Sequence, residues 1–324
     1  MDKITIIVPC YNEEEVLPKL YEEIKKTRKL MPEQQLELLF VDDGSRDGTL
    51  SLVRDLAEQD PLVRYLSFSR NFGKEAAMYA GLENADGDYV VFMDSDLQDP
   101  PALLPDMYRA VTEEGYDSVA TRRVTRKGEP PVRSFFARQF YKLMNRFSTT
   151  EVMDGARDYR MMNRKFVGGL LQLKEYNRFS KGLFGWVGFK TKWLEYENVE
   201  RAAGETKWSF WKLFKYSIEG IVAFTTAPLV LASVLGLICC VLSILFIILI
   251  IIRKLLFDNS AYGWASLVCL ITFIGGIQLF AVGVLGQYIS KMYMEIKKRP
   301  IYLIGETNIE KCPPEVLVVR KVEP

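Results

Sequence analysis

The 324-residue chain contains no histidine. This absence excludes a Ser-His-Asp or Cys-His triad, a histidine-ligated zinc site and an imidazole general base. Any proton transfer in this protein must therefore use carboxylates, lysine, tyrosine, cysteine or the substrate itself.

The sequence also lacks an excess of charge of either sign. Its 42 lysine and arginine residues face 41 aspartate and glutamate residues, which leaves a net charge of +1. A general nucleic-acid binder usually carries a clear basic excess, so we expect no nucleic-acid partner. The five cysteines, at positions 10, 239, 240, 269 and 312, form no CxxC pair. We therefore expect free thiols in a reducing compartment.

Two long stretches, 229–252 and 265–290, contain no charged residue. The first reaches about 36 Å at about 1.5 Å per residue, which is longer than the hydrocarbon core of a bilayer. A short polar loop, 253–264, separates the two stretches. We predict a transmembrane hairpin; the alternative is a pair of buried helices in a soluble protein.

Basic residues indicate how this hairpin is oriented. They flank it at Lys207, Lys212, Lys215, Lys291, Lys297, Lys298 and Arg299, whereas the loop has Arg253 and Lys254, partly offset by Asp258. By the positive-inside rule, both chain termini are expected in the cytoplasm. The N-terminal residues 1–10 do not resemble a signal peptide, which agrees with a cytoplasmic location for residues 1–207.

The first 120 residues alternate between β-rich and helix-favouring segments. We predict strands at 4–8, 36–41, 63–68, 89–93 and 118–121, with helices at 13–30, 49–59, 72–84 and 101–114. This alternation indicates an α/β fold, a parallel sheet with helices on both faces. Such sheets bind ligands at the carboxyl ends of their strands. Polar segments follow four of these strands, at 9–15, 42–49, 69–75 and 94–100, so an active site is predicted there.

The segment DSDLQDP, 94–100, follows an apolar strand. Asp94 and Asp96 project to the same side of an extended chain, where they repel each other unless a cation lies between them. Gln98 offers a third oxygen, and an all-oxygen ligand set suits Mg²⁺ or Mn²⁺. The alternative is an acidic turn in which Asp99 caps a helix that begins at Pro100 or Pro101. That alternative leaves Asp94 and Asp96 without a role.

Two further segments suit a nucleoside. Asp42 or Asp43, at the end of a strand, can accept hydrogen bonds from a ribose or a base. In the segment 9–15, Pro9 stiffens the turn, Tyr11 offers a ring to pack on a base, and Glu13 offers a second acceptor. Each residue alone could equally belong to an ordinary turn or a helix cap.

The motifs VPCYNEEE, DDGS, NFGKEAAMYAG and DSDLQDP, in this order, resemble family 2 glycosyltransferases with the A-type, Rossmann-like nucleotide-sugar fold. Further motifs narrow the resemblance to the polyprenyl-phosphate glycosyltransferases, bacterial relatives of dolichol-phosphate mannose synthase. These motifs are DYRMMNR (158–164) and RAAGETKWSFWKL (201–213), followed by the two uncharged apolar stretches. Thr206 and Trp208 stand where relatives often have Ser and Tyr. The QxxRW motif of processive synthases is missing from the sequence, which argues against polymer synthesis.

The resemblance implies a role for each matching residue. Asp158 and Asp96 are the expected catalytic carboxylates. The expected nucleotide-sugar contacts are Pro9, Tyr11, Glu13, Asp42, Asp43, Lys74, Asp94 and Ser95. Asp94, Asp96 and Gln98 are expected to hold Mg²⁺ or Mn²⁺. Arg122, Arg160, Arg201 and Lys207 are expected to bind the acceptor phosphate.

The implied activity is inverting transfer of a hexose, glucose or N-acetylglucosamine, from a UDP-sugar to undecaprenyl phosphate at the bacterial inner membrane. The product would serve cell-envelope glycan modification, and a homo-oligomer is compatible with the resemblance. Two alternatives stay open. One is a non-catalytic membrane scaffold or lipid-flipping subunit, and the other is a transferase with a soluble acceptor.

The expected organisation divides the chain into six parts. A cytoplasmic transferase domain spans 1–207, and an amphipathic juxtamembrane helix spans 208–228. The hairpin then follows as helix 229–252, loop 253–264 and helix 265–290, and a basic cytoplasmic tail covers 291–324. A second amphipathic stretch, 133–147, suits either the membrane interface or packing on its own domain.

Overall fold

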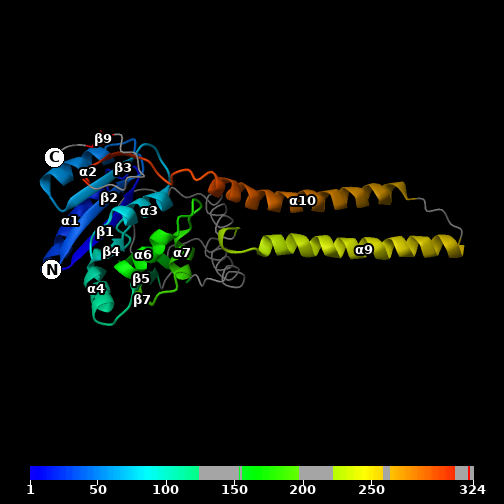
Figure 1. Ribbon diagram of the computed structural model, residues 1–324, viewed down its shortest axis with the longest axis horizontal. Coiled ribbons are helices and arrows are strands. Elements are labelled where there is room, and N and C mark those ends of the chain that lie inside the picture. The colour runs from blue at the N-terminus through cyan, green and yellow to red at the C-terminus, as the bar shows by residue number, and fades with distance from the viewer. Residues whose placement is uncertain (124–152, 154, 197–221, 258–262, 311–319, 322–324) are drawn as a thin grey trace.

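The computed structural model describes residues 1–123, 153, 155–196, 222–257, 263–310 and 320–321. It consists of an α/β domain from which a long helical hairpin projects (Figure 1). The N-terminus and residues 320–321 lie on the α/β domain. The amphipathic stretch 133–147, most of 208–228, and the site candidates Arg201 and Lys207 lie outside the described residues.

The α/β domain is built on one sheet, which has the order β7-β5-β6-β4-β1-β2-β3-β8-β9 in the described part of the chain. The strands are β1 (Lys3–Cys10), β2 (Gln35–Asp42), β3 (Val63–Phe68), β4 (Tyr89–Phe92), β5 (Ser118–Arg123), β6 (Ala156–Asn163), β7 (Thr191–Tyr196), β8 (Ile304–Thr307) and β9 (Arg320–Lys321). Strands β1 to β4 run parallel, as predicted. However, β6 is antiparallel to β4 and β5, and β8 is antiparallel to β3. The sheet is therefore mixed and not wholly parallel.

Helices cover both faces of this sheet, as predicted. Helices α1 (Leu17–Leu30), α2 (Thr49–Gln59) and α4 (Leu104–Thr112) pack on one face, and α3 (Lys74–Asn84), α6 (Arg164–Gln172) and α7 (Ser180–Trp186) pack on the other. Successive side chains of β2 alternate between these two cores, with Leu38 and Phe40 in one and Leu39 and Val41 in the other. Burial on both faces explains why the strands are continuous apolar runs.

The parallel pairing brings the polar segments to one edge. Cys10 lies opposite Asp42 at the end of β1 and β2, and Ile7 lies opposite Phe92 at the end of β4. Segments 9–15, 42–49 and 94–100 therefore leave the sheet from the same edge, where the sequence predicts the active site.

The hairpin consists of α9 (Ala227–Phe257) and α10 (Trp264–Ile296). Within them, Ala227–Ile252 and Leu267–Ile296 are long and apolar enough to cross a membrane. Their apolar side chains are largely exposed, for example Leu245 and Phe273. Exposed apolar area of this extent is suited to lipid rather than to water. Cys10, Cys239, Cys240 and Cys269 are free thiols, as expected.

The segment after α10 is not a simple basic tail. It returns to the α/β domain, where β8 pairs with the edge strand β3. Tyr302 stacks on Phe68 with ring centroids 5.1 Å apart, and its hydroxyl donates to Glu83 at 2.6 Å. Glu306 forms an ion pair with Arg54 of α2. The domain therefore includes residues far beyond 207, and the chain enters and leaves the hairpin on the same side.

Replacing Tyr302 with alanine is expected to destabilise the α/β domain by about 3–5 kcal/mol, the usual cost of truncating a large buried aromatic residue. Only 2% of Tyr302 is exposed, so the change leaves a cavity beside Phe68 and breaks the bond to Glu83. The apparent melting temperature of the purified protein in detergent measures the effect. Leu30→Ala, at an exposed position on α1, is the matched control and should change little. Equal melting temperatures for the Tyr302 variant and the wild type would contradict docking of the returning segment.

Candidate active site

A lysine joins two carboxylates at the predicted edge. Lys74 is the first residue of α3, Asp94 follows β4, and Asp158 lies in β6. The Lys74 Nζ atom is 2.6 Å from Asp94 Oδ1 and 2.6 Å from Asp158 Oδ2. The three side chains are partly exposed, at 40%, 22% and 18% respectively, so solvent reaches this ion-pair bridge, called the Lys74 bridge below.

The bridge fixes the protonation states of Lys74 and Asp158. Burial lowers the pKa of Lys74, but the charges of Asp158 and Asp94 outweigh burial and raise this pKa above its ordinary value. Burial raises the pKa of Asp158, because it disfavours the ionised carboxylate. The positive charges of Lys74 and, to a smaller extent, Lys181 outweigh burial and hold this pKa well below its ordinary value. Asp158 is therefore ionised at neutral pH. A carboxylate with a lowered pKa is a weak general base, so Asp158 is better suited to orienting a substrate than to accepting a proton.

Arg157 is a second cation at this site, which the sequence analysis missed. Its guanidinium lies 4.0 Å from Asp94 Oδ2 and 3.3 Å from Asp99 Oδ1, and it donates to Gln98 Oε1 at 3.4 Å. In the sequence, the signal for this role of Arg157 is its position next to Asp158. The acidic segment 94–100 also requires positive charge nearby. The two cations, Lys74 and Arg157, therefore hold Asp94 from both sides.

The capping alternative for Asp99 is wrong. The short 3₁₀ helix η1 (Pro101–Leu103) has Pro100 at its N-cap, with no side-chain cap. Asp99 is fully buried, and it accepts hydrogen bonds from Arg157 and, at 2.7 Å, from the Tyr196 hydroxyl. Its carboxylate therefore ties the 94–100 loop to β6 and β7 instead of starting a helix.

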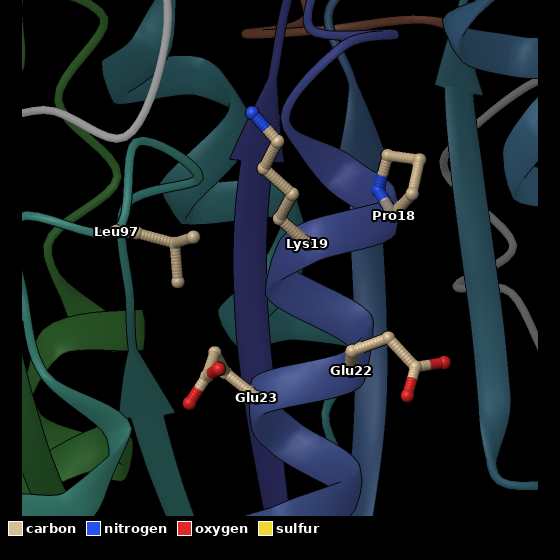
Figure 2. A pocket seen from close by; sticks show the side chains of 5 residues that line it. All are labelled: Pro18, Lys19, Glu22, Glu23 and Leu97. Carbon is tan, nitrogen blue, oxygen red and sulfur yellow. The ribbon is translucent and has the colours of Figure 1, made fainter.

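The 94–100 loop makes a tight turn at Leu97. Its backbone is left-handed there, with a φ of 55°, and Asp96 Oδ1 accepts a hydrogen bond from the Gln98 N–H at 3.1 Å. Figure 2 shows the Leu97 side chain facing α1. The hollow beside it has a volume of about 470 Å³. This hollow is lined by Pro18, Lys19, Glu22, Glu23 and Leu97. It lies on the α1 side of the loop and includes no member of the Lys74 bridge.

The two predicted nucleoside carboxylates have different environments. Asp42 accepts hydrogen bonds from the Ser67 hydroxyl at 2.7 Å and from the Ser45 N–H at 3.1 Å, so it joins β2 to β3. Asp43 accepts from the Phe72 N–H at 2.6 Å and the Gly73 N–H at 2.9 Å. Gly73 has a φ of 99° and directly precedes Lys74. Asp43 therefore fixes the start of α3, and with it the backbone of Lys74.

The remaining nucleoside candidates lie in two connected loops. Pro9 is paired with Val41 in the sheet. The Glu13 N–H donates to Thr49 Oγ1 at 2.8 Å, and Tyr11 is partly exposed. The segments 9–15 and 42–49 are thus held together at the edge of β1 and β2. Ser95 is buried between Asp94 and Asp96.

Two of the four acceptor-phosphate candidates, Arg122 and Arg160, are among the residues that the structure describes. Arg122 pairs with Glu195 across β5 and β7. Arg160 is only 3% exposed, donates to Ser118 Oγ at 3.1 Å, and has the Phe184 ring 4.3 Å from its guanidinium. Burial lowers the pKa of Arg160 to about 9. The Arg160 side chain therefore lies inside the domain among aromatic rings, which argues against a direct contact with a phosphate.

Comparison with known proteins agrees with this geometry. The family model "Glycosyl transferase family 2" matches residues 5–171, which include most of β1, all of β2 to β6 and the Lys74 bridge. The chain belongs to glycosyltransferase family 2. A putative glycosyltransferase, CsbB, of Bacillus subtilis (strain 168) is 44% identical over 94% of this chain and 92% of its own length. The bactoprenol glucosyl transferase of Shigella phage SfII is 41% identical over 94% and 98%.

A solved structure is also similar to this family 2 glycosyltransferase. Mannosyl-3-phosphoglycerate synthase from Rubrobacter xylanophilus matches 68% of this chain and 72% of its own, with 19% identity and a TM-score of 0.48. The family match confirms the expected A-type fold and sugar transfer, and the chain is an enzyme of the hexosyltransferase class.

A divalent cation is the group that this family implies. In the described part of the chain, no three His, Cys, Asp or Glu side chains are already arranged as a metal site. The 94–100 loop nevertheless presents Asp94, Asp96 and Gln98, whose oxygens are the ligand type that Mg²⁺ and Mn²⁺ prefer. The chemistry of these side chains fits such an ion, and Lys74 and Arg157 currently balance the charge of Asp94.

Proposed function

We propose that this glycosyltransferase transfers glucose from UDP-glucose to a polyprenyl phosphate, undecaprenyl phosphate in bacteria. The observation that carries the proposal is the Lys74 bridge between Asp94 and Asp158, in a domain attached to both ends of an apolar hairpin. A lipid acceptor stays in the bilayer, so its transferase must be held at the membrane surface. The bactoprenol glucosyl transferases, at 40–42% identity over 93–94% of this chain, support glucose and this acceptor.

The donor lies along the edge of β2, β1 and β4 in this proposal. Tyr11, Glu13 and Asp43 contact the nucleoside at the connected loops 9–15 and 42–49. The diphosphate then extends toward Lys74 and Arg157, whose charges stabilise it as it leaves. Asp94, Asp96 and Gln98 would hold Mg²⁺ or Mn²⁺, which when bound neutralises further charge on the diphosphate.

The acceptor needs positioning more than deprotonation. A phosphate monoester has a second pKa near ~6, so it is largely a dianion at neutral pH. One of its oxygens attacks the anomeric carbon, the bond from that carbon to the UDP oxygen breaks, and UDP leaves with the electron pair. Attack opposite the leaving group converts the α-linked donor to a β-linked lipid product. Asp158 orients the sugar or acceptor in this step, which agrees with its lowered pKa.

The hairpin anchors the enzyme in the inner membrane in this proposal, with the catalytic domain and both termini in the cytoplasm. β8 follows α10 and pairs with β3, so the chain returns to the α/β domain after the hairpin. Two membrane crossings are consistent with the whole domain lying on one side of the membrane. The lipid-linked glucose then serves as a donor for a later glycosyl transfer in cell-envelope glycan modification.

The affinity for UDP-glucose is expected to weaken as the pH falls through about 6. Burial raises the pKa of Asp43 to about 6, and the charge of Asp42 adds to this rise. The backbone hydrogen bonds from Phe72 and Gly73 lower this pKa, as does the charge of Arg70. Below that pH the carboxyl is protonated and loses its strength as an acceptor, both for the nucleoside and for the start of α3. Calorimetric titration of UDP-glucose without acceptor, from pH 5 to 8, measures the effect. Asp43→Asn should bind weakly at every pH, and a wild-type affinity independent of pH would contradict this role.

Transfer from a panel of labelled nucleotide sugars tests the proposal. The purified full-length protein is incubated with undecaprenyl phosphate and Mg²⁺ or Mn²⁺, with an EDTA control, and the label in the organic extract is counted. UDP-glucose should label the lipid in a metal-dependent way, ahead of UDP-N-acetylglucosamine. Label from another donor would replace glucose with that sugar, and transfer only to a water-soluble acceptor would overturn the lipid acceptor.

A further inference from the structure

The segment 176–181 connects the end of the hairpin to the active site. On one side, Glu295, in the last turn of α10, accepts hydrogen bonds from the backbone N–H groups of Tyr176 at 2.9 Å and Asn177 at 3.2 Å. On the other side, Glu75 accepts from the Ser180 N–H at 3.0 Å and from the Ser180 hydroxyl. Two carboxylates from different parts of the molecule thus fix one short segment.

Glu75 follows Lys74 directly in α3, so the segment is attached next to the ion-pair bridge. Lys181 comes immediately after Ser180 in the first turn of α7. The electrostatic influence of Lys181 on Asp158 is second only to that of Lys74 among the neighbouring charges. The fixed segment therefore brings a third cation toward Asp158.

Lys181 differs from the other two cations, Lys74 and Arg157, in its ion pairs. Lys74 is shared between Asp94 and Asp158, and Arg157 contacts Asp94, Asp99 and Gln98. Among the described residues, no ion pair engages Lys181. Its ammonium group is thus available to an anion that enters the site beside Asp158.

The position of Lys181 favours the acceptor over the donor. The nucleoside loops follow β1 and β2, whereas Asp158 lies in β6, on the opposite side of β4 in the sheet. The segment is also attached to the last turn of α10, the end of a candidate membrane span. A polyprenyl phosphate holds its phosphate at the level where such a span ends, so it approaches from this side.

We propose that Lys181 binds the phosphate of the lipid acceptor, and that Glu75 and Glu295 are positioning residues that hold the Lys181 segment from the domain and from α10. This inference rests on the proposed function, because it names a contact of that same site. It assigns acceptor binding to a residue outside the set expected from sequence motifs, and it places Lys181 where Arg160 was expected to act.

Steady-state kinetics of the full-length protein with undecaprenyl phosphate tests the role of Lys181. Lys181→Ala should raise KM for undecaprenyl phosphate by roughly 10- to 100-fold, the effect of losing a hydrogen bond to a charged group. KM for UDP-glucose should stay within about twofold, and Lys181→Arg should retain most of the acceptor affinity. Lys165→Ala is the matched control, since that lysine lies on α6 and pairs with Asp117. An unchanged acceptor KM in Lys181→Ala, or an equal rise in both KM values, would overturn the inference.

The positioning role has its own readout. Glu295→Ala should raise KM for undecaprenyl phosphate while KM for UDP-glucose is unchanged, and Glu295→Gln, which keeps an acceptor oxygen, should recover most of the loss. A purely structural role would instead lower the melting temperature and affect both substrates, which overturns positioning. If the wild type transfers no glucose to lipid, the proposed function fails together with the inference. If it does, and Lys181→Ala behaves like the wild type, the inference alone fails.

Discussion

Replacing Asp158 with asparagine is expected to lower kcat by about 10²–10³-fold, the usual effect of removing one preorganised electrostatic contact in an active site. The change leaves Lys74 with only Asp94 as an anionic partner, because the carboxylate 2.6 Å from its Nζ atom becomes neutral. It also removes the ionised group that orients the reacting sugar or phosphate. Initial rates of glucose transfer at saturating substrates measure the effect.

The Asp158 substitution should affect turnover more than donor binding, because the nucleoside loops lie at β1 and β2, across β4 from Asp158. KM for UDP-glucose is therefore expected to stay within a few-fold. Asp106→Asn, at an exposed position in α4 where the carboxylate pairs only with Arg109 among the described residues, is the matched control. A variant that keeps more than a tenth of wild-type turnover, with an unchanged melting temperature, would rule out the role given to Asp158.

Replacing Asp96 with asparagine is expected to lower turnover at least about 100-fold and to weaken the dependence on divalent cation. Asp96 is in the loop that presents Asp94 and Gln98, and its carboxylate also accepts the Gln98 N–H that closes the turn at Leu97. Asparagine keeps an oxygen for that hydrogen bond but removes the charge that a cation needs. Rates measured over a titration of Mg²⁺ and of Mn²⁺ provide the test.

The half-saturating metal concentration should rise in Asp96→Asn, so that added cation restores part of the rate. The Asp106→Asn variant again controls for the loss of one negative charge. A scaffold or lipid-flipping protein would keep its function in this variant. Wild-type rate and wild-type metal dependence together would show that Asp96 does not hold the ion.

The central strands could be predicted from the sequence because their burial is encoded locally. In β1 and β2, both faces are covered by helices, which requires continuous apolar runs bounded by polar turns. Strands β6 and β8 were missed because their pairing is not local. The residues of β6 are charged at several positions, and β8 joins β3 from beyond the whole hairpin.

The carboxylates of the site were also predictable, since they follow strands that end at one edge. The partners of those carboxylates were not. Arg157 and Asp99 acquire their roles from contacts between β6, β7 and the 94–100 loop. Arg160 was expected to bind a phosphate because of the resemblance to the polyprenyl-phosphate glycosyltransferases, and nothing in the sequence around it indicated burial. Its burial depends on aromatic rings that come from α6, α7 and β7, including Phe184 and Trp193.

The most direct test of glucose transfer at the Lys74 bridge is a side-by-side assay of the wild type and Asp158→Asn. Both purified proteins receive UDP-[¹⁴C]glucose, undecaprenyl phosphate and Mg²⁺, and label in the organic phase is followed with UDP release. The wild type should produce lipid-linked glucose with one UDP released per glucose transferred, while Asp158→Asn should produce about 1% of that amount or less. Absence of lipid label from the wild type, or equal label from both proteins, would contradict the account.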